Sequence, residues 1–499
     1  PGNANTGSGL ATLLLGVPTN FAQRETPILD RRSWYLAGFI QDDWNIRPGL
    51  TLNLGVRWET DTPVNDLNGR LNGFAMDQIN PVSGTPGVVK FAGVDGFRTQ
   101  IYDTDWNNFG PRFGFAWRPF GVQRMVVRGG FGVFFAHPFD RAVANVATLG
   151  FERSSNLVLQ DNNLGIPYTM GGGMPIPPLA EAVRNDSFGA VPVGQVSTQA
   201  VTFFEIDRRT GYSQQFNLQV QREIPGGMVA ELSYLGNLSR KLGSDNLSIN
   251  QIPPWIVGPG RTGRQYRPFP QFSNVSVLAP SLGVSSYHGG VLKVQKRFSR
   301  GFNVISTYTW SKFLDNCSGG GSTLGDEGAA YSNFYNRKAD WGPSENDVRH
   351  RFTFGSVYQL PFGRRRAYLR RHPARHLAGD WSLSAVVTIQ SGAPITVQTQ
   401  TNSTNANSAG AQRADVLRNP NLPADERNVK RWFDTGAFAQ PPQYTFGNQG
   451  VGLVRADGRV NINTSLIRAF SVREGMQLQF RGEFFNLPNH PNFGNATHQ

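Results

Sequence analysis

The sequence is poor in cysteine and has no long apolar run. Its 499 residues include one cysteine, Cys317, so no disulfide can form within the chain and a disulfide-stapled secreted scaffold is excluded. The longest apolar stretches, such as residues 11–17, are far shorter than the ~20 apolar residues that a transmembrane helix needs. Hydrophobic residues make up only 39% of the chain. A bundle of membrane helices is therefore excluded as well.

Sequence signatures of catalysis and of metal binding are also scarce. The seven histidines form no HExxH pattern, and Pro373 between His372 and His376 discourages a helix that would align these two rings. No P-loop with its lysine is present. Asp42 and Asp43 are adjacent in a predicted strand, so their side chains face opposite sides and cannot act as an acid–base pair. We expect no enzyme activity, no catalytic or metal-binding residue and no cofactor.

The chain is strongly basic, with a formal charge of +13 and a pI of about 10.1. Such a value raises the possibility of nucleic-acid binding. The lysines and arginines are spread along the chain, however, and no helix or zinc-knuckle pattern presents them together. We therefore expect no nucleic-acid partner, and we assign the charge to contact with anionic lipid headgroups of a membrane.

Alternation of apolar and polar residues is the strongest positive signal in the sequence. In residues 215–224, Phe216, Leu218 and Val220 alternate with glutamine and asparagine, and residues 476–485 follow the same pattern. The pattern predicts twelve strands, at residues 33–46, 50–60, 110–119, 123–136, 212–223, 228–236, 286–299, 302–313, 348–361, 378–393, 456–471 and 475–486. Most are 10 to 14 residues long. Strands in soluble proteins usually have ~5–6 residues, whereas a tilted strand needs ~9–11 to cross a bilayer.

Short and long connections alternate between these strands. The short ones contain Pro and Gly, as tight turns do, at residues 47–49, 120–122, 225–227, 300–301 and 473–475. The long ones are polar segments at residues 61–109, 137–211, 237–285, 315–346 and 395–455. Outer-membrane barrels have short periplasmic turns and longer extracellular loops. The sequence therefore predicts an all-β, antiparallel transmembrane β-barrel with the long segments outside the cell.

One connection on the predicted periplasmic side is exceptional. Residues 364–375 contain six arginines, namely Arg364, Arg365, Arg366, Arg370, Arg371 and Arg375. They could contact anionic lipid or a periplasmic partner, but a solvated turn insertion is the interpretation we favour.

The direction of each predicted strand also bears on the ends of the chain. The strand at 475–486 runs outward, so we expect a closing strand beyond Gln499. The strand at 33–46 runs inward, and residues 9–16 are a candidate for the end of an earlier strand. We accordingly divide the chain into an N-terminal loop or strand end at residues 1–32 and a barrel domain at 33–499, which contains about 12 strands and ends before the closing strand.

Tryptophans and polar side chains each have an expected place in such a barrel. Tryptophans recur toward the strand ends, where aromatic girdles sit at the membrane interfaces: Trp34, Trp44, Trp58, Trp117, Trp310 and Trp381. The polar strand faces are expected to line the lumen, with Gln215, Asn217, Gln219, Gln221, Glu223, Gln477, Gln479, Arg481 and Glu483.

Several strand motifs resemble a known family. The segments "FIQDDWNIRPGLTLNLGVRWE" (39–59), "NFGPRFGFAW" (108–117), "DVRHRFTFGSVYQLPFG" (347–363) and "FRGEFFNLPNHPNFG" (480–494) resemble the barrel of TonB-dependent transporters of the Oar-like group. The resemblance extends over nearly the whole chain, in the family's order. It implies a barrel of ~22 strands, of which this chain would supply about 12. It implies a Gram-negative outer-membrane transporter that imports a large, scarce solute, such as a metal chelate, glycan or peptide.

The resemblance also implies partners. In such transporters a plug inside the barrel binds the solute and is pulled by the TonB–ExbB–ExbD complex, so outer-membrane lipid, this complex and an unidentified solute are the expected partners. No plug or TonB box is found in these 499 residues, and the substrate-binding residues cannot be named. The alternatives are a passive porin, a surface adhesion barrel and, outside membranes, a secreted β-rich glycan-binding protein.

Overall fold

The computed structural model describes residues 20–26, 28–119, 124–136, 149–158, 181–244, 246–317, 331–363, 366–408, 412–473 and 475–494. Within these ranges the protein consists of β-strands and irregular segments with a few short helices. None of the helices in this part of the chain is long and apolar enough to span a membrane.

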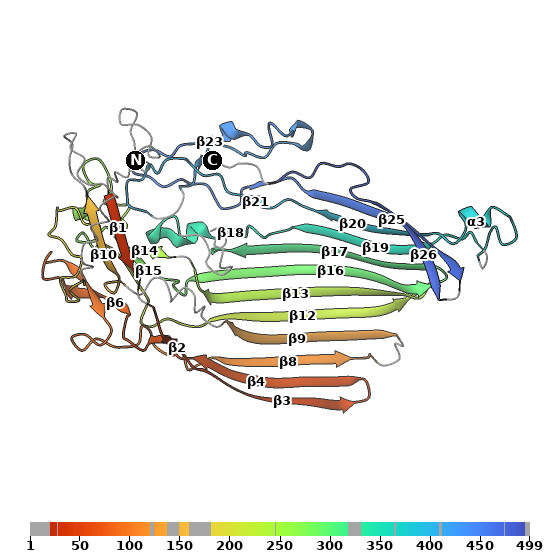
Figure 1. The fold of residues 1–499 in the computed structure, drawn as a ribbon, viewed down its shortest axis with the longest axis horizontal. Coiled ribbons are helices and arrows are strands. Elements are labelled where there is room, and N and C mark those ends of the chain that lie inside the picture. Colours follow the sequence, from red (N-terminus) through yellow and green to blue (C-terminus); the bar gives the residue numbers. More distant parts are fainter. Residues whose placement is uncertain are drawn as a thin grey trace, which may run out of the picture.

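Twelve long antiparallel strands lie side by side in one sheet, which we call the wall (Figure 1). Each strand pairs with the wall strands before and after it in the chain, so the order in the sheet is the order in the sequence. They are β3 (Tyr35–Arg47), β4 (Leu50–Asp61), β8 (Phe109–Trp117), β9 (Met125–Ala136), β12 (Gly211–Ile224), β13 (Met228–Leu242), β16 (Gly283–Ser299), β17 (Phe302–Asp315), β19 (His350–Gln359), β20 (Ser382–Gln390), β25 (Arg459–Arg473) and β26 (Met476–Phe484). The short strand β18 (Gly342–Pro343) pairs with β17 outside this path.

All twelve predicted strands are confirmed, with corrections at some ends. Strand β13 continues to Leu242, beyond the predicted end at residue 236, and it remains paired with β16 through Ser239. The alternation did not reveal this extension, because Gly236 and Arg240 stand where the pattern through Leu232, Leu238 and Leu242 requires apolar residues. Strands β19 and β20 are shorter than predicted at both ends.

The tight turns are confirmed where the structure describes them. Gly49 follows β3 with φ 90°, Gly226 and Gly227 follow β12 with φ 89° and 70°, and Gly475 precedes β26 with φ 76°. Glycine adopts such left-handed conformations without the steric cost that a Cβ imposes. The predicted turn at 120–122 lies outside the described residues, as do residues 9–16.

The register gives the wall two chemically different faces. Residues opposite each other in an antiparallel pair lie on the same face, so Leu54, Phe113 and Phe131 share one face through the pairs Leu54↔Phe113 and Phe113↔Phe131. Following the pairs across the wall puts most of its exposed apolar side chains on this outward face, among them Leu54, Val56, Phe113, Phe131, Leu218, Leu232, Tyr234, Leu292, Tyr308, Trp310, Leu383, Ile389, Leu478 and Phe480. Phe39, Ile305 and Val386 are exposed apolar residues that the register puts on the opposite face. A band of exposed apolar side chains around a wall is what lipid contact requires.

The five long segments gather at one end of the wall, opposite the short turns (Figure 1). They contain short strands: β5 (Asn65–Asp66), β6 (Asn72–Ile79), β7 (Pro86–Phe91), β10 (Arg153–Val158), β11 (Ala200–Phe203), β14 (Leu247–Ser248), β15 (Asn274–Val277), β21 (Pro394–Ile395), β22 (Asp415–Val416), β23 (Phe438–Ala439) and β24 (Val454–Arg455). Strands β1 (Asn20–Glu25) and β2 (Arg31–Arg32) pair with β10 and β5. The short helices are η2 (Arg264–Tyr266), η3 (Phe334–Asp340), η4 (Ala424–Glu426) and η5 (Thr435–Ala437).

These segments form a packed layer with its own core, which we call the loop layer. Its largest apolar cluster joins four of the five long segments: Phe74, Val89, Phe91, Val201, Phe203, Leu247, Ile249, Phe269, Phe272, Val275, Val277 and Tyr331. Phe74 contacts the rings of Phe203, Phe269 and Phe272 at centroid distances of 5.1, 5.1 and 5.9 Å. The sequence predicted generic polar loops, because these apolar residues are scattered and follow no strand or helix period.

Candidate functional site: the inner face and the loop layer

The inner face of the wall is mostly polar. The predicted lumen residues of β12 and β26 do lie on the face opposite the apolar band, since Asn217 pairs with Gly130 while the adjacent Leu218 pairs with Gly129 and Tyr234. The register adds residues from other strands to this face: Asp43, Asn53, Arg57, Arg112, Arg128, Asn237, Glu231, Lys293, Thr307, Thr309, Arg351, Thr388, Asn461 and Asn463. The register therefore extends the predicted separation of apolar and polar residues on opposite faces from these two strands to the other strands of the wall.

Hydrogen bonds across neighbouring strands hold the side chains of the inner face. Asn53 Nδ2 donates to Asp43 Oδ1 at 2.6 Å, and Arg128 Nη1 donates to Gln221 Oε1 at 2.9 Å. Asp43 faces inward while Asp42 lies opposite Leu54 on the outward face, as their adjacency predicted. Such a surface offers donors and acceptors to water or to a polar occupant of the lumen.

A charged cluster lies at the loop end of β3 and β4, on the inner face. Arg57 donates from Nε to Glu59 Oε2 at 2.7 Å and from Nη2 to the Tyr35 hydroxyl at 2.7 Å, and that hydroxyl donates to Glu59 Oε2 at 2.7 Å. Glu59 is buried. The three groups fix one another at the rim where the lumen meets the loop layer.

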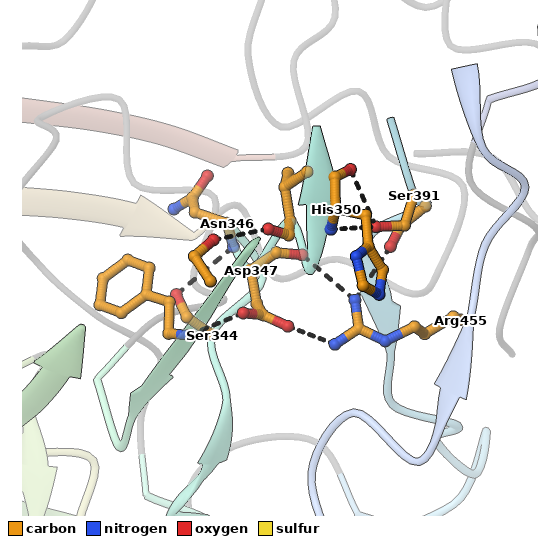
Figure 2. A network of polar contacts seen from close by, with 10 residues as sticks. Ser344, Asn346, Asp347, His350, Ser391 and Arg455 are labelled. Atoms are coloured by element: carbon orange, nitrogen blue, oxygen red, sulfur yellow. Dashed lines mark hydrogen bonds and ion pairs between the residues drawn. The ribbon is translucent and has the colours of Figure 1, made fainter. Parts of the chain in front are cut away.

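An ion pair joins two of the long segments where they leave the wall (Figure 2). Asp347, which is 1% exposed, pairs with Arg455, and its Oδ1 accepts a hydrogen bond from the Phe313 amide at 2.6 Å. Arg455 Nη1 also donates to the carbonyls of Asp347 and Gly392 at 3.3 and 3.1 Å. We call this group the Asp347 latch. It connects the end of β17 to the segments before β19 and β25.

A second pair of contacts lies next to the Asp347 latch, where β19 begins and β20 ends. The His350 amide donates to Ser391 Oγ at 2.8 Å, and the Ser391 amide donates to the His350 carbonyl at 2.9 Å (Figure 2). Deeper in the loop layer, Arg413 and Asp340 form a buried ion pair at 2.5 Å between the fourth and fifth long segments. These contacts bind the segments into one unit above the wall.

Arginines and aromatic rings meet in the loop layer. The Arg208 guanidinium lies over the rings of Tyr102 and Phe204, at 5.5 and 5.9 Å from their centroids. Burial lowers the pKa of Arg208. Burial and the neighbouring Asp207 raise the pKa of Glu205, and Arg208 opposes this shift. A cation over aromatic faces is a recognised binding chemistry, although here the ring contacts are satisfied within the protein.

The predicted tryptophans lie at both ends of the wall. Trp44, Trp117 and Trp381 are at the turn end, and Trp34, Trp58 and Trp310 are at or toward the loop end. Trp310 is 63% exposed on the outward face. Trp58 stacks on Trp106, with 6.2 Å between ring centroids. The pattern agrees with two interfacial girdles.

The arginine-rich connection does lie at the turn end, and the short helix α3 (Arg375–Ala378) is part of it (Figure 1). Arg364 and Arg365 are outside the described residues. His372 and His376 flank Pro373 without forming a common helix face, since α3 begins only at Arg375. Among the residues that the structure describes, no group of three or more His, Cys, Asp or Glu could hold a metal ion.

The sequence analysis missed the latch residues and the charges buried in the loop layer. Asp347 is the first residue of the motif at 347–363, but its partner Arg455 lies 108 positions away in the sequence. No local sequence pattern links the two residues. The profile of the family described as "Outer membrane beta barrel domain" matches residues 1–499.

The chain belongs to this family of outer membrane β-barrel domains. It therefore lies in the outer membrane. Because outer-membrane barrels have short periplasmic turns and longer extracellular loops, we expect the short turns in the periplasm and the loop layer outside the cell. No curated protein matches it significantly.

Solved outer-membrane proteins resemble this barrel domain distantly. The transporter YddB of Escherichia coli has 8% identity and a TM-score of 0.43 over 92% of this chain and 50% of its own. The siderophore receptor PiuA of Acinetobacter baumannii has 8% identity and a TM-score of 0.40 over 92% and 40%. The ferripyoverdine receptor of Pseudomonas aeruginosa has 8% identity and a TM-score of 0.42 over 93% and 36%. The chain thus spans half or less of these structures.

Proposed function

We propose that this barrel domain belongs to a transporter that imports a large, scarce solute, such as a metal chelate, glycan or peptide, with energy supplied by the TonB–ExbB–ExbD complex. The polar inner face is the main structural observation behind this proposal. Twelve strands line it, more than the ~8 strands at which side chains alone fill a barrel, and barrels of ~22 strands hold a plug.

The loop layer supports a receptor in particular. Its buried core and its latches make it a preorganised surface at the loop end of the wall, and preorganisation reduces the ordering cost of capturing a ligand. The motif resemblance to TonB-dependent transporters points to the same function. The passive porin and the adhesion barrel remain as alternatives that an experiment can separate from it.

Conductance measurements on the full-length protein in planar bilayers distinguish active import from passive diffusion. We expect no steady ion conductance, because a plug would block the lumen, together with binding of the purified periplasmic domain of TonB. Steady open-channel currents without TonB binding would favour a porin. No conductance and no TonB binding would favour an adhesion barrel.

A further inference from the structure

The most basic part of the turn end is the segment between β19 and β20. Residues 366–381, the longer of its two described parts, are here called the arginine arm. It contains Arg366, Arg370, Arg371 and Arg375 against a single acid, Asp380. Arg366 lies 3.8 Å from Asp380, so one cation of the arm already has an acidic neighbour. The arm therefore has a surplus of positive charge.

Arg468 of β25 fixes the arm to the wall. Its guanidinium donates to the carbonyls of Leu377 and His376, at 2.6 and 2.8 Å, and it is only 7% exposed. The same guanidinium lies over the rings of Phe470 and Trp381, at 4.3 and 5.6 Å from their centroids. Trp381 Nε1 also donates to the Leu377 carbonyl at 2.9 Å.

The contact between Arg468 and the arm lies on the outward face of the wall. Arg468 pairs with Phe480, an exposed residue of the outward apolar face. Trp381 contacts Phe480 edge-on, with 5.7 Å between ring centroids. The arm is therefore attached to the lipid-facing side of the barrel at its periplasmic end. It is not attached to the lumen side, where a plug would lie.

The arm also exposes apolar side chains next to its cations. Leu377 is 81% exposed and Tyr368 is 62% exposed, and both Arg370 and Arg371 are exposed. Exposed apolar groups beside cations are typical of segments that lie in a membrane interface, with the apolar groups toward the acyl chains and the cations at the phosphates. Arginine suits this role because its guanidinium binds phosphate oxygens in a bidentate manner.

We propose that the arginine arm lies on the periplasmic leaflet of the outer membrane and binds the phosphate groups of its anionic phospholipids. Arg370 and Arg371 bind the headgroups, and Leu377 and Tyr368 insert at the boundary of the acyl chains. The arm then acts as a lipid-binding element of the outward face, independent of the transported solute.

Lipid retention measures the headgroup contact directly. Native mass spectrometry of the full-length protein in detergent, titrated with phosphatidylglycerol, would compare the wild type with the double variant R370Q/R371Q. The matched control is R297Q/R300Q, which removes two exposed cations at the turn end, one near the end of β16 and one in the turn between β16 and β17. Altered migration of unheated protein on gels verifies that each variant is folded.

We expect roughly tenfold weaker phosphatidylglycerol binding in R370Q/R371Q, near wild-type binding in the control, and no displacement by inorganic phosphate. Equal loss in both variants would overturn the proposal, because general surface charge would then explain the binding. Unchanged binding in R370Q/R371Q would overturn it too.

A spin label at position 377 tests where the arm lies, without depending on lipid affinity. The variant is L377C in a C317S background, reconstituted in vesicles that contain phosphatidylglycerol. We expect the label to collide more often with dissolved oxygen than with a water-soluble nickel complex. A label that remains in water would overturn the proposal and would favour a periplasmic protein as the partner of the arm.

Discussion

Leu218 and Asn217 are neighbours in β12, yet the register gives them different surroundings. Leu218 is 48% exposed on the outward face, whereas Asn217 lies on the inner face opposite Gly130. A strand of a membrane wall exposes alternate residues to hydrocarbon and to the lumen, so the cost of a charge alternates with period 2. The division into two faces can therefore be tested one residue at a time.

The variant L218R is expected to reduce the free energy of unfolding by roughly 2–4 kcal/mol, as for an arginine near mid-membrane. The adjacent variant N217R is expected to have a small effect, because it places the charge in a polar lumen. Urea unfolding of the protein folded in lipid vesicles provides the comparison. Similar losses for both variants would be inconsistent with the assigned faces.

Glu205 provides a pH-dependent test within the loop layer. Burial and Asp207 raise the pKa of Glu205 above its usual 4.5, against the opposing charges of Arg208 and Arg337. Folding therefore favours the protonated carboxyl, and the ionised form destabilises the layer once the pH exceeds the folded-state pKa. We expect E205Q to slow hydrogen exchange of the nearby Leu278 amide, which donates to the Phe203 carbonyl, at about pH 7. The difference should vanish at about pH 4, and a difference of the same size at both pH values would contradict this assignment.

The elements of the wall could be predicted from the sequence, whereas those of the loop layer could not. In the strands that contain Leu54 and Leu218, apolar and polar residues alternate along the chain. Lipid on one side of the wall and a polar lumen on the other favour this alternation in every wall strand. Phe74 and Phe272 have no such local signal, because their partners come from other segments of the chain. The same is true of Asp347 and Arg455, whose pairing depends on where β17, β19 and β25 end.

The Asp347 latch is the element on which the junction between the wall and the loop layer depends. The variant D347A leaves Arg455 without its carboxylate and the Phe313 amide without its acceptor. Removing one partner of a buried ion pair typically costs roughly 3–5 kcal/mol. We expect faster proteolysis of the segments 331–349 and 391–458 on intact cells, while the wall still shifts its migration on unheated gels. The matched control D425A removes an exposed acid from η4 and should leave proteolysis unchanged.

At the scale of the whole molecule, the loop layer, the wall and the arginine arm follow one another in this order from one end to the other (Figure 1). The loop layer is polar and charged at its surface but has an apolar core, the wall is apolar outside and polar inside, and the arm is basic. The loop layer, the wall and the arm thus match, in this order, the cell exterior, the bilayer and the periplasmic leaflet. The formal charge of +13 includes the arm, so the strongly basic composition agrees with lipid contact.

The orientation of the barrel in the outer membrane is tested most directly by labelling single cysteines on intact cells. In a C317S background, D425C places a thiol on the exposed surface of the loop layer, and P225C places one in the tight turn after β12. A maleimide too large to pass through porins should label D425C on intact cells and should label P225C only after the outer membrane has been permeabilised. Labelling of P225C on intact cells, or protection of D425C, would contradict the assigned orientation.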